Sequence, residues 1–125
     1  MNYRGGCHCG RIAFEVEGCL EEVSECNCSI CTKKAYLHWI VAPDYFRLLT
    51  PRANLATYTF NTHAAKHYFC PVCGVAPFYV ARSDPDKIDV NVRCVEGVRF
   101  DKLRLRRFDG RNWERAQADR LAGRS

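Results

Sequence analysis

A mainly β domain of short strands is the fold that this sequence favours. Short segments in which hydrophobic and polar side chains alternate recur along the chain, which is typical of half-buried strands. Nine cysteines stand in a chain of 125 residues, most of them in three clusters. Their number is odd, and the start MNYRGG contains no apolar leader, so the cysteines indicate metal ligands rather than a disulfide framework. We therefore expect metal to tie the strands together.

Seven segments carry strand patterns. In the first of them, Ile12, Phe14 and Val16 fall on one face of an extended chain. The next three are rich in aromatic and β-branched residues, and Pro43 and Pro51 separate them. The predicted strands cover residues 11–17, 36–41, 46–49, 55–60, 75–81, 88–92 and 103–108.

Only the C-terminal end favours a helix. Asn112 is a residue type that caps helices, and Gly123 is one that ends them, so we expect a short helix through Leu121. A helix of this length needs docking to be stable, and Trp113 is the residue expected to anchor it.

The net charge of +5 is concentrated at the same end. Residues 99–125 hold nine basic and four acidic residues, while the charges before them cancel. Such a segment is either a solvated face or an attachment site for an anionic partner. No run approaches the roughly 20 apolar residues that span a bilayer, so we expect a cytoplasmic protein with no membrane partner.

Two cysteine pairs share a signature. CHCG contains Cys7 and Cys9, and FCPVCG contains Cys70 and Cys73. Each pair can present two thiolates to one ion, and the glycine that follows lets the backbone turn around the metal. Together they predict one tetrahedral zinc site that joins the start of the chain to its middle.

A third cluster, ECNCSIC, is incomplete. It supplies three thiols, Cys26, Cys28 and Cys31, without a glycine. Catalytic zinc typically keeps three protein ligands and one open position, so an open site is one interpretation. The alternative is a closed site whose fourth ligand comes from elsewhere, and the candidates are Cys19, Cys94, His63 and His67.

The motifs GGCHCG, CNCSIC and FCPVCG, in this order, resemble the glutathione-dependent formaldehyde-activating enzyme family, which includes centromere protein V. The segments DKIDVNVRC, YTFNTH and FDGRNWE are most similar to the centromere protein V branch. The resemblance extends from Gly5 to about Glu114. We therefore expect one zinc-binding domain over residues 1–114 and a basic tail over residues 115–125. Because every cysteine lies before position 95 and the end of the chain is short and marginally helical, we also expect residues 111–125 to be dispensable for metal binding.

The resemblance implies a mainly β, Mss4-like fold of short antiparallel strands organised around two zinc ions. It assigns the structural zinc to the four-cysteine set and the catalytic zinc, which we expect to be more labile, to Cys26, Cys28 and Cys31. The implied enzyme is a carbon–sulfur lyase that joins glutathione and formaldehyde to S-(hydroxymethyl)glutathione. TKKAYLHW follows the triplet where the family often has an arginine-rich segment and a glycine, which leaves open a related thiol or aldehyde as substrate.

Glutathione carries two carboxylates, so nearby cations are candidate anchors. His67 and Tyr36 are candidates for proton transfer. The candidate substrate-binding residues are Lys33, Lys34, Lys66, His67 and Arg93. The alternative function is a non-enzymatic zinc module of the centromere protein V type whose basic C-terminal segment binds nucleic acid or an acidic protein.

Overall fold

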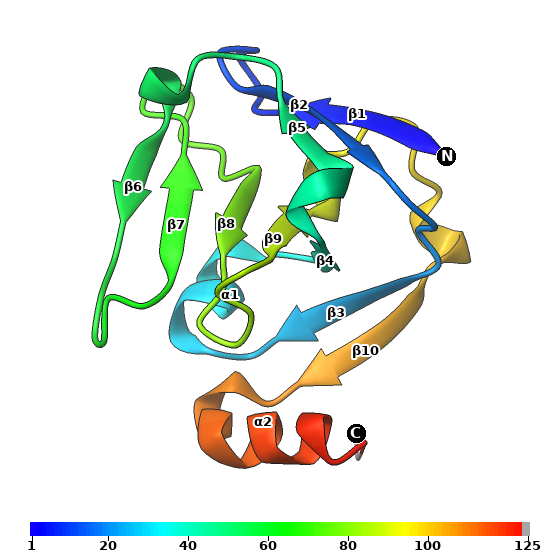
Figure 1. The fold of residues 1–125 in the computed structure, drawn as a ribbon, viewed down its shortest axis with the longest axis vertical. Coiled ribbons are helices and arrows are strands. Elements are labelled where there is room, and N and C mark those ends of the chain that lie inside the picture. Colours follow the sequence, from blue (N-terminus) through cyan, green and yellow to red (C-terminus); the bar gives the residue numbers. More distant parts are fainter. Residues whose placement is uncertain (124–125) are drawn as a thin grey trace.

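Two β-sheets make up the computed structural model, which describes residues 1–123 (Figure 1). The smaller sheet has the order β1-β2-β5, and the larger has the order β10-β3-β4-β9-β8-β7-β6. The strands of the smaller sheet are β1 (Asn2–Gly6), β2 (Ala13–Glu17) and β5 (Phe46–Leu48). Those of the larger sheet are β3 (Glu22–Cys26), β4 (His38–Val41), β6 (Ala56–Tyr58), β7 (Lys66–Phe69), β8 (Phe78–Val80), β9 (Ile88–Asn91) and β10 (Arg104–Phe108).

This architecture confirms the predicted mainly β fold with a short C-terminal helix, and each predicted strand segment contains a strand. Among the described strands, all pairs are antiparallel, as expected, except β10 with β3, which is parallel. Strands β1, β3 and β7 were missed because each has only one buried residue, which leaves little alternation of hydrophobic and polar side chains in the sequence.

The prediction that only the C-terminal end is helical was wrong. A short helix, α1 (Ser29–Lys34), carries the third cysteine cluster. Its N-cap position is Cys28, whose thiol accepts a hydrogen bond from the Cys31 N–H at 3.5 Å. A cysteine at the N-cap is outside the usual set of capping residues, so the start of the helix had no sequence signal.

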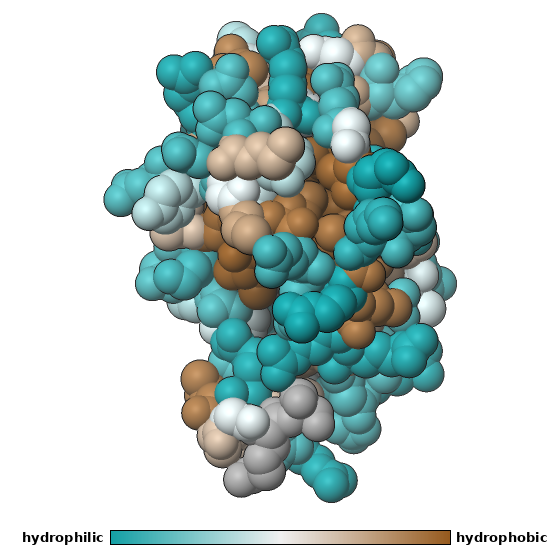
Figure 2. All heavy atoms as spheres, turned by 90° about the vertical axis from the view of Figure 1, so that its right-hand side faces the viewer, coloured by the Kyte–Doolittle hydropathy of each residue, from teal (hydrophilic) through white to brown (hydrophobic). Residues whose placement is uncertain are grey.

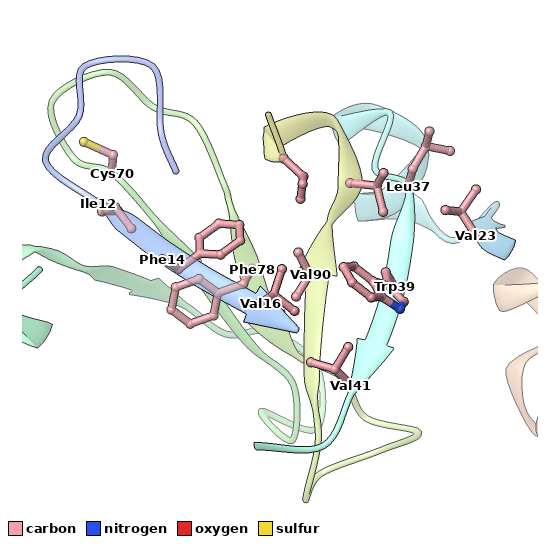
Figure 3. Packing of buried hydrophobic residues seen from close by; sticks show 12 residues of the cluster. Ile12, Phe14, Val16, Val23, Leu37, Trp39, Val41, Cys70, Phe78 and Val90 are labelled. Carbon is pink, nitrogen blue, oxygen red and sulfur yellow. The ribbon is translucent and has the colours of Figure 1, made fainter. Parts of the chain in front are cut away.

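The core lies between the two sheets. Successive side chains of a strand point to opposite faces, and Trp39, Val90 and Phe78 form one row across β4, β9 and β8. Figure 3 shows this row facing Phe14 and Val16 of β2, and all five side chains are at least 92% buried. The rings of Phe14 and Phe78 meet edge to face, with centroids 6.4 Å apart.

The C-terminal helix, α2 (Trp113–Leu121), lies beyond β10 at the end of the larger sheet (Figure 1). Asn112 takes the N-cap position as expected, but its amide donates to the Asp109 carboxylate instead of capping the helix. Gly123 follows the helix with a left-handed φ of +77°. The expected domain boundary between residues 114 and 115 falls inside α2.

Trp113 does anchor this helix. The guanidinium of Arg82 lies 3.8 Å from the centre of the Trp113 ring, a cation–π contact. At the other end of the helix, Arg120 forms an ion pair with Asp84 at 3.4 Å. Helix α2 is therefore held at both ends by the loop that follows β8.

Part of the basic C-terminal charge is paired within the chain. Arg104 and Arg106 of β10 form ion pairs with Glu22 of β3, and Arg107 forms one with Glu25. Figure 2 shows the side that faces right in Figure 1, where hydrophilic groups surround a hydrophobic area. Among residues 1–123, no helix is both long and apolar enough to cross a membrane.

Candidate functional site

The first cysteine cluster joins the two sheets. Cys7 follows β1, and Cys70 follows β7, so each pair lies in the turn between two strands. The four Sγ atoms of Cys7, Cys9, Cys70 and Cys73 all lie within 4.8 Å of one another. The glycine after each pair has a left-handed φ, +88° for Gly10 and +80° for Gly74, as the spacing predicted.

The donor set of this cluster fits zinc. Four thiols in mutual contact match the usual tetrahedral structural site. Backbone N–H groups point at the sulfurs: Ile12 donates to the Cys7 Sγ at 3.3 Å, and Cys73 donates to the Cys70 Sγ at 3.5 Å. A hydrogen bond from the backbone N–H of Val75 is the main reason why the pKa of Cys73 is lowered to about 6. Such donors stabilise the thiolate form, which is the form that binds metal.

The second cluster is assembled by one strand end and one helix start. Cys26 is the last residue of β3, Cys28 is the N-cap of α1, and Cys31 lies in the helix and is buried. Because the chain turns from strand to helix between them, their three Sγ atoms converge within 4.8 Å.

Hydrogen bonds within this cluster favour one thiolate. Bonds from the Cys26 and Cys31 thiols lower the pKa of Cys28, and the thiols of Cys26 and Cys28 raise the pKa of Cys31. Three thiolates in contact repel one another unless a cation lies between them. A divalent metal ion would replace the remaining protons, so this donor set also fits zinc, with three ligands.

None of the four candidate fourth ligands belongs to either cluster of ligand atoms in residues 1–123. Cys19 is exposed, and the thiol of Cys94 points to the Ala76 carbonyl at 3.9 Å. His63 is exposed, with Nδ1 2.7 Å from the Thr59 hydroxyl. His67 lies in β7 and is buried.

The C-terminal segment covers the three-cysteine cluster. The side-chain amide of Asn27 donates to the Asp109 carboxylate at 2.9 Å. Arg111 donates twice to Asn27, from its N–H to the side-chain oxygen at 3.0 Å and from Nε to the carbonyl at 2.8 Å. These contacts argue against the expectation that residues 111–125 are dispensable for metal binding. Sequence analysis missed Asp109, whose only signal was its place in the FDGRNWE motif; Asn27 lies within CNCSIC.

Gly110 leaves no room for a side chain beside the cluster. A Cβ built on this residue would clash with the Cys26 Sγ and lie 2.8 Å from the Cys28 Cβ. We therefore expect Gly110→Ala to displace Cys26 or Cys28. Zinc affinity at this cluster should fall about tenfold or more, which is the typical effect of disturbing groups that orient metal ligands. Competition with a chromophoric chelator measures this, and the four-cysteine site should be unaffected. Unchanged affinity at both sites would contradict the close packing.

A cavity of about 1020 Å³ opens beside the three-cysteine cluster, which is the upper end of the size range of ligand sites. Its walls come from the face of the larger sheet that points away from the core, from the loop after β8 and from α2. Asp89, Tyr79 and His67 form a row on this face, and His38 lies on the same face of β4.

The structure brings only one of the five predicted substrate-binding residues to this cavity, and that residue is His67. Arg93 instead donates to the Ala35 carbonyl at the end of α1, and Lys66 donates to the His63 carbonyl. Lys33 is exposed, and burial lowers the pKa of Lys34. Tyr36 is buried and is absent from the cavity wall. The cations that do line the cavity are Arg82, Arg106, Arg107, Arg111, Arg115 and Arg120.

His67 is held by aromatic stacking. Its ring lies 4.8 Å from the Tyr79 ring at an interplanar angle of 10°, and 5.6 Å from the Phe60 ring. Burial, followed by the charge of Lys34, lowers the pKa of His67 to about 4. The imidazole is therefore neutral at pH 7.

A second buried histidine was missed by sequence analysis. His38 Nδ1 lies 3.0 Å from both carboxylate oxygens of Asp89, and the Tyr79 hydroxyl lies 3.3 Å from the same nitrogen. The Tyr36 hydroxyl donates to the Asp89 carbonyl at 2.9 Å. Burial raises the pKa of Asp89, and the charge of His38 opposes this effect. The one sequence signal for this pair was that His38 and Asp89 are polar residues within segments of mainly apolar residues that were predicted as strands.

These features place the protein in a class of small β proteins with two cysteine clusters. Both clusters can hold a metal ion, and their thiol ligands are consistent with zinc. The sequence model of the glutathione-dependent formaldehyde-activating enzyme family matches residues 2–106, and the chain belongs to this family. The fold is also similar to the crystal structure of a Rhodobacter sphaeroides protein, with a TM-score of 0.73 and 31% sequence identity. That match covers 82% of this chain and 99% of the other. The family match ends before the segment that covers the three-cysteine cluster.

Proposed function

We propose that the protein is a carbon–sulfur lyase that joins glutathione, or a related thiol, to formaldehyde, or a related aldehyde, and that it also catalyses the reverse cleavage. The observation that carries this proposal is the position of Cys26, Cys28 and Cys31, a three-ligand set in the wall of a large cavity. Family membership supports the same reaction class.

The three cysteines would hold a zinc ion, and the four-cysteine set would hold a second, structural one. When bound, zinc at an incomplete site can lower the pKa of a thiol and so supply a nucleophile at neutral pH. A free thiol has a pKa near 8.5, so little of it is ionised without such help. The chain itself has to bind and orient the two substrates and move one proton.

The cavity arginines are suited to bind the carboxylates of glutathione. Arg82 is held by the Trp113 ring, and Arg111 is held by Asn27, so the two guanidinium groups have defined positions on the cavity wall. Arginine binds carboxylates in a planar, bidentate manner. We assign substrate anchoring to these residues in place of Lys33, Lys66 and Arg93, which do not line the cavity.

The test is the glutathione-dependent loss of formaldehyde, followed by proton NMR, together with the zinc content per chain. We expect turnover and two zinc ions for the wild type. We expect Cys28→Ser to lose one zinc and to lower turnover at least a hundredfold, because the substituted site retains only two thiols. Cys19→Ser is the matched control, since this cysteine is exposed and outside both clusters.

X-ray absorption at the zinc edge separates an open site from a closed one. Glutathione should add a sulfur to the zinc shell of the wild type, and Cys28→Ser should abolish that change. Full activity of Cys28→Ser with two zinc ions bound would contradict the proposed site.

A further inference from the structure

We propose that His38, held by Asp89, is the group that carries the proton between the thiol and the carbonyl oxygen. This inference rests on the proposed function and names a catalytic residue for it. The pair is buried in the cavity wall, outside both cysteine clusters.

Strand register places His38 beside the three-cysteine cluster. His38 of β4 lies directly opposite Ser24 of β3, and Cys26 follows Ser24 by two residues. Side chains two residues apart in a strand share one face, so His38 and Cys26 lie on the same face of the larger sheet. Both also line the cavity.

Asp89 determines which nitrogen of His38 is free. Both Asp89 carboxylate oxygens lie 3.0 Å from Nδ1, so Nδ1–H donates to the carboxylate and the lone pair of the neutral ring is on Nε2. The Nε2 atom is buried and, in the part of the chain that the structure describes, has no hydrogen-bond partner. A buried polar atom without a partner is costly, and here it belongs to a residue of the cavity wall.

The neighbours of His38 come from three other strands of the larger sheet and from the segment just before β4. The titratable ones are Asp89 from β9, Tyr79 from β8, Tyr36 just before β4, and His67 from β7, whose pKa the charge of His38 helps to lower. His67 fits the task less well than His38. Among the described residues, its ring makes stacking contacts, and no carboxylate pairs with it.

His38 alone can carry out both proton transfers of the reaction. As the thiol sulfur attacks the aldehyde carbon, the S–H bond breaks and its proton passes to Nε2, while a C–S bond forms. The π electron pair of the C=O bond moves to oxygen, which then takes the proton from Nε2–H. Nothing is oxidised or reduced, and the reverse cleavage uses the same transfers. Asp89 stabilises the imidazolium that exists between the two steps.

The first experiment compares His38→Gln with His63→Gln under the conditions of the formaldehyde assay. General acid–base catalysis contributes typically 10²–10⁴-fold, so we expect kcat of His38→Gln to fall by that factor with KM within about twofold. The acidic limb of the pH–rate profile should disappear, and the zinc content should stay at the wild-type value. His63→Gln is the control, since His63 is exposed and outside the cavity. Asp89→Asn should lower kcat and shift the profile.

A second experiment needs neither a variant nor turnover. Long-range ¹⁵N NMR of the wild type should show the His38 proton on Nδ1 and a bare Nε2. A proton on Nε2 at pH 7 would overturn the proposal. An active wild type with an equally active His38→Gln would overturn it too, while the proposed function would stand. A wild type without turnover that shows the Nδ1–H form would overturn the proposed function and, with it, the proton carrier role.

Discussion

Cys70→Ser is expected to prevent folding. Cys70 is completely buried, and its Sγ lies 3.6 Å from that of Cys9, at the point where the two sheets are joined. Structural zinc contributes roughly 10 to 16 kcal/mol in small modules, which is as large as the entire stability of a typical domain, about 5 to 15 kcal/mol. With the metal site broken, the packed core between the two sheets has to hold them together without the metal.

Circular dichroism with thermal unfolding and zinc analysis measures this effect. Cys70→Ser should show no cooperative transition and should bind no zinc at the four-cysteine set. Cys28→Ser is the comparison, because it removes one thiol from the other cluster and should keep the transition. Two variants that unfold alike would mean that both zinc ions are structural.

Truncation after Asp109 is expected to remove the zinc of the three-cysteine cluster and to leave the fold intact. It deletes both hydrogen bonds from Arg111 to Asn27 and the α2 wall of the cavity. Loss of groups that orient metal ligands typically costs 10–100-fold in metal affinity, so under dilute conditions zinc content should fall from two ions to one. Turnover should fall with it.

Truncation after Gly123 is the matched control for this experiment. It retains Trp113, Arg120 and every other contact described for α2. Its zinc content and turnover are expected to equal those of the full chain. If the truncation after Asp109 also binds two zinc ions with wild-type affinity, the C-terminal segment is a tail and not part of the site.

Local features of the sequence were sufficient to predict which cysteines gather into the two clusters. In CHCG and FCPVCG, the spacing and the following glycine specify a turn that presents two thiols, and the structure gathers both pairs. Strands with clear alternation, such as β2, were predicted for the same reason. Strand β3 was missed because Val23 is its only buried residue.

Substrate-binding residues could not be chosen from the sequence in the same way. Lys33 and Lys34 are close to the three-cysteine cluster in the chain, yet they lie outside the cavity wall, while Arg82 and Arg111 belong to it. Both lysines share helix α1 with Cys31, but successive residues of a helix point in different directions, so closeness along the chain does not bring a side chain to the cavity wall. The cavity is formed by strands and a helix that are far apart in sequence.

The sequence by itself determined the family, the mainly β class and the two cysteine clusters, because each depends on residues that are close together in the chain or on strand periodicity. Only the tertiary structure decided that His38 meets Asp89, 51 residues further along, and that Arg111 meets Asn27 across 84 residues. The physical reason is strand register. A shift of one residue between β4 and β9 would turn His38 or Asp89 to the other face of the sheet, and only the packing of the whole core selects the register that brings them together.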